Sequence, residues 1–345
     1  MKFLEKVKSS FDWVSGDIAI DLGTANTLIW LAGRGIIINE PSIIAKSTKT
    51  NEVLAVGNEA KEMLGKTHKG IETIRPLRDG VIADYNAVDS MLQGFIRKVN
   101  LNRLTRPKMV ICVPSGVTEV ERRAVKDSGE KQAAREVFLV DEPVAAAIGI
   151  GLDISKPVGN IIVDIGGGTT EVAVISLNGV VTKKAIRVAG DEMDEAIIQW
   201  FRNEHKLEIG EQTAEEIKIS VGSAMRIRSS KNILVKGRDL VSGIPKTIEV
   251  RSDEIRQALK DPVTRIVEVI KQALEDTPPQ LSADIVERGI MLTGGGSLLY
   301  NLDKVLRRST SLPVSIAEDP LLCVVMGTGK ALEEKSKLSD IFASD

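Results

Sequence analysis

Two short segments of the sequence place a carboxylate, glycines and threonines at the end of an apolar run. Asp21 opens the segment DLGTANT and Asp164 opens the segment DIGGGTT, and each follows a strand-like stretch. Glycine lets the backbone approach an oxyanion closely, while turn N–H groups and threonine hydroxyls donate hydrogen bonds to it. Aspartate oxygens suit Mg²⁺, which keeps several of its waters and neutralises phosphate charge. Each segment therefore predicts a turn that holds phosphate and a hydrated metal.

The recurrence of this segment carries more information than either copy. One copy alone resembles an ordinary β-turn, but two copies in matching context, about one domain length apart, indicate a duplicated domain. Facing each other, two such turns would hold the β- and γ-phosphates of a nucleotide from both sides. The expected phosphate contacts are Asp21, Gly23, Thr24, Ala25 and Asn26 in the first copy and Asp164, Gly166, Gly167, Gly168 and Thr169 in the second, with Asp21 and Asp164 binding the metal through water.

A third glycine cluster follows the apolar stretch from Ile290 to Leu292. It is expected to pass beside a ribose or adenine and to open a helix from Leu299 to Arg308; a plain strand-to-helix turn is the alternative. The residues concerned are Gly294, Gly295, Gly296, Ser297 and Leu298. Two other phosphate motifs are excluded. GTGK at 327–330 lacks the flanking residues of a P-loop, and the glycines at 166–168 open into a β-rich run instead of a helix.

Strand-like and helix-like runs alternate along the chain, which predicts an α/β layered fold built twice. The first series has strands at 17–21, 27–31, 35–39, 42–45, 109–113 and 137–140, and helices at 86–99, at 118–128 and from 143. The order restarts with strands at 161–165, 171–176 and 180–188, a helix at 191–204 and another after 210. A last helix at 323–334 is expected to return to the first lobe.

Composition excludes several classes of protein. A chain of 345 residues suits two domains, and a net charge of -2 provides no field that would attract nucleic acid. Cys112 and Cys323 lie in apolar stretches, which favours buried thiols in a reducing compartment over a disulfide. His68 and His205 lack ligand or triad spacing, so neither a zinc site nor a Ser-His-Asp hydrolase is expected and both are predicted at the surface. No run is long and apolar enough to span a membrane.

The motifs together resemble the five nucleotide-site motifs of the actin and sugar-kinase superfamily, with DEPVAAAI at 141–148 and GTGKAL at 327–332 completing the set. Four further stretches are similar to the MreB family of bacterial actins: NEPS at 39–42, RPLRDGVIAD at 75–84, VPS at 113–115 and KGRD at 236–239. The resemblance covers about residues 17–332. It implies a duplicated two-lobe actin-like (ribonuclease H-like) ATPase fold with a nucleotide cleft between the lobes.

The resemblance also implies a function and its partners. A protein of this kind binds ATP and Mg²⁺, polymerises with itself into filaments on the inner face of the plasma membrane, and organises cell-wall synthesis that maintains rod shape. Its expected partners are other copies of the chain, anionic inner-membrane lipid and the cell-shape membrane proteins of the rod complex, with no nucleic acid. Its expected location is cytoplasmic and peripheral to the membrane.

By the same resemblance, specific residues take roles. Glu142 and Thr169 would place the water that attacks the γ-phosphate, although Glu142 beside Pro143 also suits the first turn of a helix. Adenine and ribose contacts are expected at Glu215, Glu216, Ile217 and Lys218, where Glu215 and Lys218 share one helix face and a solvated ion pair is the alternative. One departure from eukaryotic actin is Leu28, which stands where actin has a phosphate-binding lysine.

Domain boundaries follow from the resemblance. Lobe I is expected to comprise residues 17–158 and 320–345, with subdomain IB at about 40–72. Lobe II is expected to comprise residues 159–319, with subdomain IIB at about 194–250. A heat-shock chaperone would need a further substrate-binding domain, which is not expected here, and a small-molecule kinase of the same superfamily is the alternative function.

The first sixteen residues predict an amphipathic segment. At about 100° per residue, its apolar side chains fall in one arc with lysines beside it, which suits a helix lying on an anionic membrane; docking onto its own lobe is the alternative. The arc contains Phe3, Leu4, Val7, Phe11 and Val14. The loop from Leu101 to Leu104 is a weaker second insertion, because Thr105 makes that face less apolar.

Overall fold

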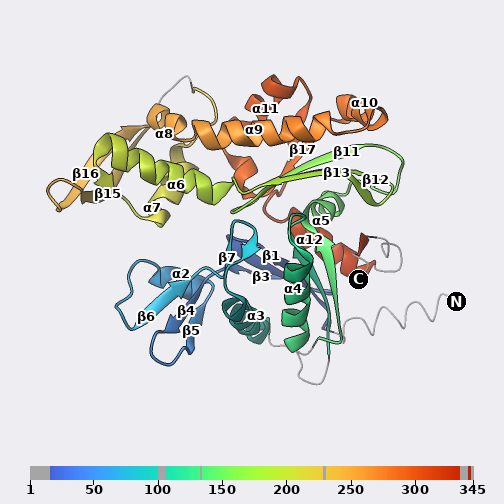
Figure 1. Ribbon diagram of the computed structural model, residues 1–345, viewed down its shortest axis with the longest axis horizontal. Helices are drawn as coiled ribbons and strands as arrows, with labels where there is room; N and C mark the ends of the chain where they lie inside the picture. Colours follow the sequence, from blue (N-terminus) through green and yellow to red (C-terminus); the bar gives the residue numbers. More distant parts are fainter. Residues whose placement is uncertain (1–15, 100–105, 133, 228–230, 335–340, 343–345) are drawn as a thin grey trace. The chain divides into compact units, whose positions relative to one another are not determined.

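The computed structural model describes residues 16–99, 106–132, 134–227, 231–334 and 341–342, which divide into two compact units (Figure 1). Unit 1 comprises Met1–Val158, Ile175–Val181 and Leu321–Asp345, and unit 2 comprises Gly159–Val174 and Thr182–Pro320. The amphipathic segment with Phe3, Leu4, Val7, Phe11 and Val14, and the loop at 101–105, lie outside the described residues. Their predicted roles remain predictions.

Unit 1 is built on a five-stranded sheet in the order β10-β9-β1-β2-β3. β1 pairs antiparallel with β2 and parallel with β9, and β9 pairs parallel with β10. The first three strands therefore form a meander, to which two parallel strands are added on the β1 side. The strands are β1 (Ile18–Leu22), β2 (Asn26–Leu31), β3 (Gly35–Pro41), β9 (Lys108–Val113) and β10 (Glu136–Asp141).

Helices cover both faces of this sheet, so its central strands are apolar on both sides. Ile18 and Ile20 of β1 share a core with α3 and α4, while Trp30 packs its ring on Gly329 of α12 at the opposite face. α12 also packs closely against α5. The helices are α3 (Tyr85–Val99), α4 (Glu119–Lys131), α5 (Glu142–Gly149) and α12 (Cys323–Glu333).

The residues between β3 and α3 in the sequence form a smaller part of unit 1. It contains a three-stranded sheet in the order β5-β4-β6, the short helix α2 (Asn58–Met63), and the two-stranded hairpin of β7 and β8. Its strands are β4 (Ile44–Ser47), β5 (Val53–Val56), β6 (Ile71–Ile74), β7 (Leu77–Arg78) and β8 (Val81–Ile82). The strand expected at 42–45 is thus β4, which belongs to this small sheet and not to the large one.

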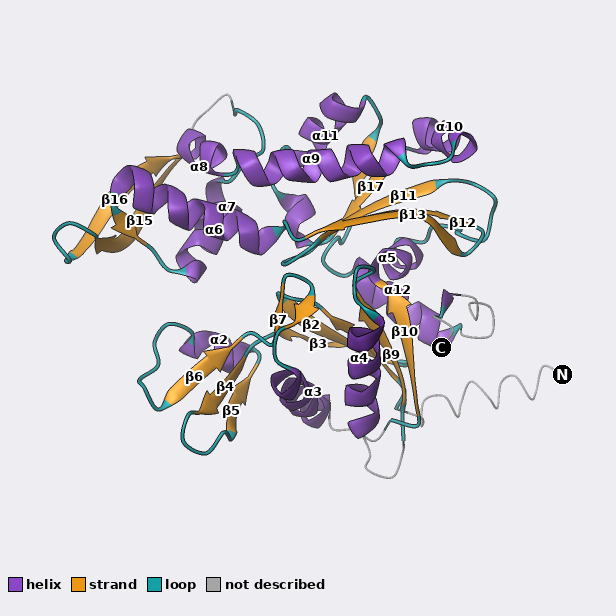
Figure 2. Cartoon of the chain, viewed as in Figure 1, coloured by secondary structure: helices purple, strands orange, loops and turns teal. Residues whose placement is uncertain are grey.

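Unit 2 repeats the topology of unit 1. Its sheet has the order β13-β12-β11-β17-β18, in which the first three strands along the chain are adjacent and two parallel strands are added beside the first (Figure 2). The strands are β11 (Asn160–Ile165), β12 (Thr170–Ser176), β13 (Gly179–Ile186), β17 (Ile290–Thr293) and β18 (Val314–Ile316). The turn between β12 and β13, with the adjoining strand ends, is the segment Ile175–Val181 that is grouped with unit 1. The duplicated α/β fold predicted from the repeated segment is confirmed.

The helices of unit 2 pack around one large core. They are α6 (Gly190–Trp200), α7 (Glu211–Val221), α8 (Ser252–Ala258), α9 (Lys260–Glu275), α10 (Pro279–Arg288) and α11 (Leu302–Thr310). Two predicted helices differ in detail. The helix expected at 191–204 is regular only to Trp200 and continues as a π-helical turn, Phe201–His205. The helix expected from Leu299 begins at Leu302, because Asn301 adopts a left-handed conformation with φ 64°.

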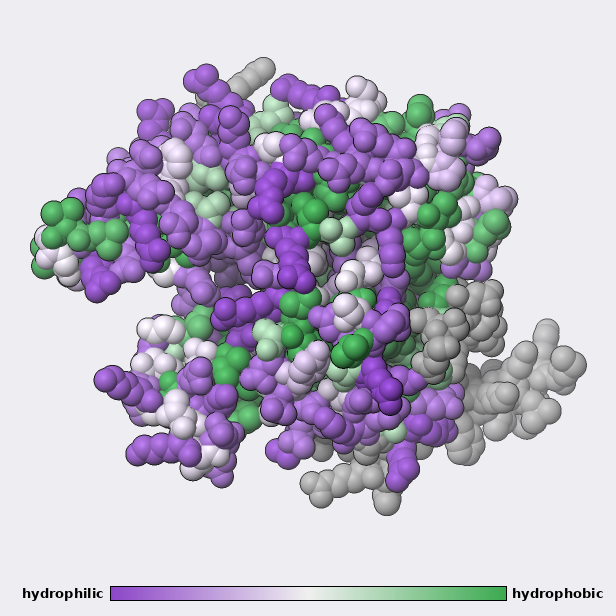
Figure 3. Space-filling model, viewed as in Figure 1, coloured by the Kyte–Doolittle hydropathy of each residue, from purple (hydrophilic) through white to green (hydrophobic). Residues whose placement is uncertain are grey.

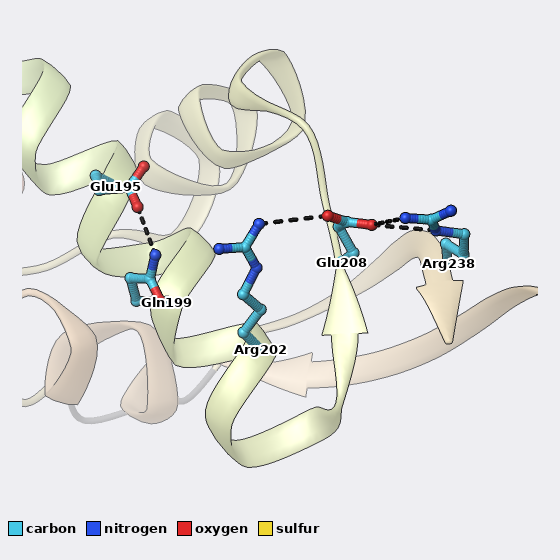
Figure 4. Close-up of polar contacts among 5 residues, drawn as sticks. All are labelled: Glu195, Gln199, Arg202, Glu208 and Arg238. Atoms are coloured by element: carbon cyan, nitrogen blue, oxygen red, sulfur yellow. Dashed lines mark hydrogen bonds and ion pairs between the residues drawn. The ribbon is translucent and has the colours of Figure 1, made fainter. Parts of the chain in front are cut away.

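A small antiparallel sheet of β14 (Leu207–Glu208), β15 (Asn232–Asp239) and β16 (Pro245–Arg251) follows the π-helical turn. Figure 4 shows Glu208 between Arg202 of the turn and Arg238 of β15. The Arg238 Nε to Glu208 Oε2 distance is 3.1 Å, and hydrogen bonding to Arg238 lowers the pKa of Glu208. These contacts join the irregular end of α6 to the sheet.

Figure 3 shows apolar side chains at the tip of the β15–β16 hairpin, among other apolar areas on the same face. Val241 is 84% exposed and Ile244 is 62% exposed there. Among the described residues no helix is both long enough and apolar enough to cross a membrane. Cys112 and Cys323 are buried and neither forms a disulfide, as predicted. His68 is exposed, but His205 is half-buried with Nε2 2.9 Å from Glu254 Oε2, so its expected surface position is only partly correct.

Candidate functional site

The first phosphate-type turn lies in unit 1 between β1 and β2. Asp21 is 9% exposed at the end of β1 and pairs with Leu28 across the hairpin. Gly23 is required by space, because a Cβ there would lie 2.7 Å from the Asn26 carbonyl oxygen. Thr24 is buried, whereas Ala25 is exposed. The turn therefore exposes backbone beside a buried carboxylate.

Two segments distant in sequence support this turn. The Ser42 hydroxyl donates to the Gly23 carbonyl at 2.6 Å and lies 2.9 Å from the Thr27 hydroxyl, and the Ser42 N–H donates to the Ala25 carbonyl at 2.9 Å. In addition, the Gly80 N–H donates to the Thr24 hydroxyl at 3.3 Å. The segments NEPS and RPLRDGVIAD, quoted above only for their resemblance, thus hold the turn in place. Sequence reasoning gave them no structural role.

Several carboxylates gather at the edge of the unit 1 sheet where β1, β9 and β10 end. Asp21 is in register with Cys112, and Asp141 with Val113. Burial, and then the charges of Glu142, Asp21 and Asp141, raise the pKa of the Cys112 thiol. Because β9 lies between β1 and β10, Asp21 and Asp141 are at the same end of three adjacent strands, and Glu142 directly follows Asp141. Glu142 itself is 7% exposed in the first turn of α5, so this polar group is held inside the protein.

The second turn lies in unit 2 between β11 and β12. The Gly166 N–H donates to the Thr169 carbonyl at 2.9 Å, which closes the turn. Gly168 is buried, and Gly166, Gly167 and Thr169 are half-buried. Two amides at the start of α6 also contact it: Gly190 N–H donates to Gly166 and Asp191 N–H to Gly167, at 3.2 and 2.8 Å. The start of α6 therefore fixes the carbonyls of this turn.

Asp164 precedes the second turn and is 5% exposed. It is in register with Thr293 of β17, whose hydroxyl donates to Asp164 Oδ1 at 2.7 Å. Burial raises the pKa of Asp164, the hydrogen bond from Thr293 lowers it, and no positively charged side chain contributes among the described residues. A hydrated divalent cation would offset the cost of burying this charge, and carboxylate oxygen is the donor that Mg²⁺ prefers. Asp164 therefore fits a metal held through water.

The described residues contain no group of three or more His, Cys, Asp or Glu side chains arranged to enclose a metal ion. Asp21 and Asp164 occupy the same place in their respective units, at the end of the first strand. Each unit thus contributes one buried carboxylate next to one glycine turn.

Helix α7 carries the residues expected at adenine and ribose. The Lys218 ammonium donates to Asp194 Oδ2 at 2.7 Å and to the Gly190 carbonyl at 2.8 Å, so it links α7 to the start of α6. Glu215 is half-buried and raises the pKa of Asp194. Glu216 is exposed, and the Ile217 side chain is buried in the core of unit 2. Ile217 can therefore face a ligand only through its backbone.

The third glycine cluster passes over the end of β11. Gly294 has φ 78°, and a Cβ there would lie 2.3 Å from the Ile165 carbonyl oxygen. A Cβ on Gly296 would lie 2.3 Å from Ile165 Cγ2. The run Gly295–Leu298 forms a short 3₁₀-helix in which the buried Ser297 hydroxyl donates to the Gly294 carbonyl at 2.6 Å and Leu298 is 53% exposed. The glycines are thus needed for close packing on the strand that carries Asp164.

The chain is similar to known proteins over nearly its whole length. The family model described as "MreB/Mbl protein" matches residues 15–340. The chain is 52% identical over 336 residues to the cell shape-determining protein MreB of Escherichia coli (strain K12), covering 96% of each chain. It is 49% identical over 323 residues to the cell shape-determining protein Mbl of Bacillus subtilis (strain 168), covering 93% of this chain and 97% of the relative.

A solved structure agrees with these matches. The crystal structure of MreB5 of Spiroplasma citri bound to ADP superposes with a TM-score of 0.88 at 40% identity, covering 94% of this chain and 97% of that chain. The same protein bound to AMPPNP gives the same values. The two-lobe actin-like fold is confirmed by this likeness.

Proposed function

Because the chain belongs to the MreB/Mbl family of bacterial actin-like cell-shape proteins, we propose that it binds ATP with Mg²⁺, hydrolyses it and assembles into filaments. The observation that supports nucleotide binding most directly is the repetition of one structure in both units. In each, a buried aspartate ends the first strand and a glycine turn follows. A 40% identical relative was solved with ADP and with AMPPNP.

In this proposal, different residues contact the phosphates, the metal ion, and the ribose and adenine of the nucleotide. The turns at Gly23–Asn26 and Gly166–Thr169 would donate backbone N–H groups to the phosphates, and Leu28 offers no charge, so the turns carry more of that role. Asp21 and Asp164 would hold Mg²⁺ through water, and this ion supplies neutralisation of phosphate charge. Lys218, Glu215 and the cluster Gly294–Leu298 would face the ribose and adenine.

Hydrolysis requires a group that orients water in line with the γ-phosphate. Glu142 is that group in our proposal, with Thr169 of unit 2 helping to place the same water. The buried position of Glu142 supports this role, because a first-turn carboxylate that only stabilised a helix dipole could remain in solvent. The carboxylate would accept a hydrogen bond from the attacking water and hold that water in line with the γ-phosphate.

The proposed function also includes filament assembly and attachment of the filament to the membrane. Filaments form when head-to-tail contacts do not close into a ring, and the exposed apolar tip of the β15–β16 hairpin is the kind of surface that such contacts bury. The amphipathic N-terminal segment would attach the filament to anionic lipid on the inner face of the plasma membrane. There it would organise wall synthesis with membrane proteins of the rod complex.

The experiment that tests the proposal is sedimentation of the purified chain with ATP, ADP or no nucleotide, with phosphate release measured in the same samples. A filament former pellets with ATP above a threshold concentration and releases phosphate without an added acceptor. A small-molecule kinase, the reading that the family match does not favour, would stay in the supernatant and need an acceptor. Failure to pellet at any concentration, with ATP demonstrably bound, would exclude the filament.

A further inference from the structure

The carboxylates at the end of the unit 1 sheet include one with a cationic partner. Asp141 ends β10, and its Oδ1 accepts a hydrogen bond from Arg122 Nη2 of α4. Both side chains are largely buried, with 14% of Arg122 and 22% of Asp141 exposed. An ion pair removed from water to this degree keeps a fixed geometry, unlike a surface pair. Asp141 is also the residue immediately before Glu142.

Helix α4 presents this arginine from a rigid first turn. The Thr118 hydroxyl accepts from the Glu121 N–H at 3.3 Å, and the Glu121 carboxylate accepts from the Thr118 N–H at 2.7 Å. This reciprocal capping box fixes the helix start. The Arg122 N–H then donates to the Thr118 carbonyl at 2.9 Å, which places Arg122 one residue beyond the box. Its guanidinium is therefore directed by a well-defined element.

The ion pair changes what Asp141 does at the start of α5. Asp141 is the N-cap residue of that helix, with extended φ and ψ, yet its side chain makes no capping hydrogen bond. Aspartate is among the strongest N-capping residues, so an unpaired Asp141 would rotate to accept from the first turn of α5. Arg122 holds the carboxylate away from that position. The backbone leading into Glu142 is consequently set by α4 as well as by its own helix.

We propose that Arg122 is a positioning residue for ATP hydrolysis, acting through Asp141 on the orientation of Glu142. The inference rests on the proposed function of Glu142. Arg122 also places a positive charge at the end of the sheet that carries Asp21, Asp141 and Glu142. Its removal would both release Asp141 and leave the carboxylates to repel one another. A displacement of about 1 Å is enough to cost on the order of 10²-fold in rate.

The test compares Arg122→Met and Arg122→Lys with Arg123→Met, a matched control because Arg123 is the next residue of α4 and is exposed. Phosphate release is measured as a function of ATP concentration and normalised to the amount of pelleted protein. This normalisation separates a change in the hydrolysis rate from a change in polymerisation. Arg122→Met should lower kcat about 10-fold or more with KM changed less than about 3-fold. Arg122→Lys should recover part of the loss, because it keeps the charge but not the planar fork. Arg123→Met should match the wild-type chain.

A kinetic double-mutant cycle with Asp141→Asn decides whether Arg122 acts through Asp141. If it does, the double variant loses no more than the more damaging single change. Additive losses, a change confined to KM, or Arg122→Met turning over like Arg123→Met would overturn the inference. If Arg122→Met and Arg123→Met turn over alike, the proposed function still stands, provided that the wild-type chain hydrolyses ATP and Glu142→Ala does not. No turnover in the wild-type filament overturns the proposed hydrolysis and this inference together.

Discussion

At the scale of single residues, the buried carboxylates are where the chain departs from an ordinary soluble core. Asp21, Asp164 and Glu142 are all less than 10% exposed, a state that carboxylates rarely adopt without a partner. Two of them end the first strand of their sheets, and the third begins a helix. Placing charge at the ends of apolar strands costs stability. Such a cost is expected at a functional site, where a bound cation would offset it.

Glu142 allows the most direct test at this scale. Glu142→Ala should keep ATP binding, because in our proposal the two glycine turns and not Glu142 hold the phosphates. It should lower turnover by about 10²-fold, the scale of losing a group that positions or accepts a proton. Phosphate release and binding of a fluorescent ATP analogue measure the two effects separately. Normal phosphate release by the variant would remove Glu142 from the mechanism.

Asp194 gives a prediction about pH. Burial raises its pKa to about 6, Lys218 lowers it in part, and Glu215 and Asp191 raise it further. Because the folded pKa lies above the unfolded one, near 3.8, the folded chain binds the proton more tightly. The contribution of Asp194 to the free energy of unfolding is therefore present at low pH and is lost as the pH rises from about 4 to about 6. Above pH 6 the loss is complete.

Asp194→Asn removes that dependence while keeping the shape and an acceptor for Lys218. Between pH 4.5 and pH 7, the free energy of unfolding of the variant relative to the wild-type chain should increase by about 1–2 kcal/mol. Denaturant unfolding of nucleotide-free protein at both pH values provides the measurement. A difference between the two chains that does not change with pH would show that the pKa of Asp194 is not raised.

At the scale of elements, the close contact of α5 with α12 is made possible by glycine. A Cβ on Gly327 would lie 1.7 Å from the Ala145 carbonyl oxygen, and one on Gly149 would lie 1.9 Å from the Cys323 carbonyl oxygen. The facing positions Ala145, Ala146 and Ala147 are small and fully buried. The two helices therefore approach at backbone distance, and α12 supports the sheet edge from which α5 projects.

Gly327→Ala should force these helices apart. The expected cost is about 1–3 kcal/mol or more in the free energy of unfolding, the scale of overpacking a dense core, with weaker ATP binding as a consequence. Gly179→Ala is the matched control, because a Cβ there meets only the Ser176 carbonyl oxygen at 3.7 Å. Thermal unfolding of both variants provides the comparison. Equal melting temperatures would mean that the helices adjust freely.

The elements also show what the sequence could and could not predict. The strands that carry Asp21 and Asp164 near their ends were predictable, because an apolar run followed by glycine is a local signal. The support of the first turn by Ser42 and Gly80 was not, since these contacts join residues far apart in the chain. The Arg122–Asp141 pair was missed for the same reason. The end of α6 at Trp200 was missed because the apolar period continues into the π-helical turn.

At the scale of the whole molecule, we propose that nucleotide binding is coupled to assembly, because ATP can favour the conformation that polymerises. Asp164→Ala should weaken binding of the metal–nucleotide complex and so raise the concentration needed for polymerisation, by about 10-fold if one charge-assisted contact of about 1.4 kcal/mol is lost. Sedimentation across a concentration series with ATP measures this threshold. Asp127→Ala, at an exposed position of α4, is the control. An unchanged threshold in a variant that no longer binds ATP would remove nucleotide control from assembly.

The last prediction concerns attachment to the membrane, which rests on the sequence of residues 1–14. One helix of about four turns with Phe3, Leu4, Val7, Phe11 and Val14 on one face would bind lipid weakly, but a filament presents many copies at once. Deleting residues 1–14, or changing Phe3 and Phe11 to Glu, should therefore abolish co-flotation of filaments with anionic liposomes and leave ATP binding intact. Ser9→Glu adds a carboxylate opposite the apolar arc and should still float. Undiminished flotation of the Phe3 and Phe11 double variant would show that another part of the chain is the anchor.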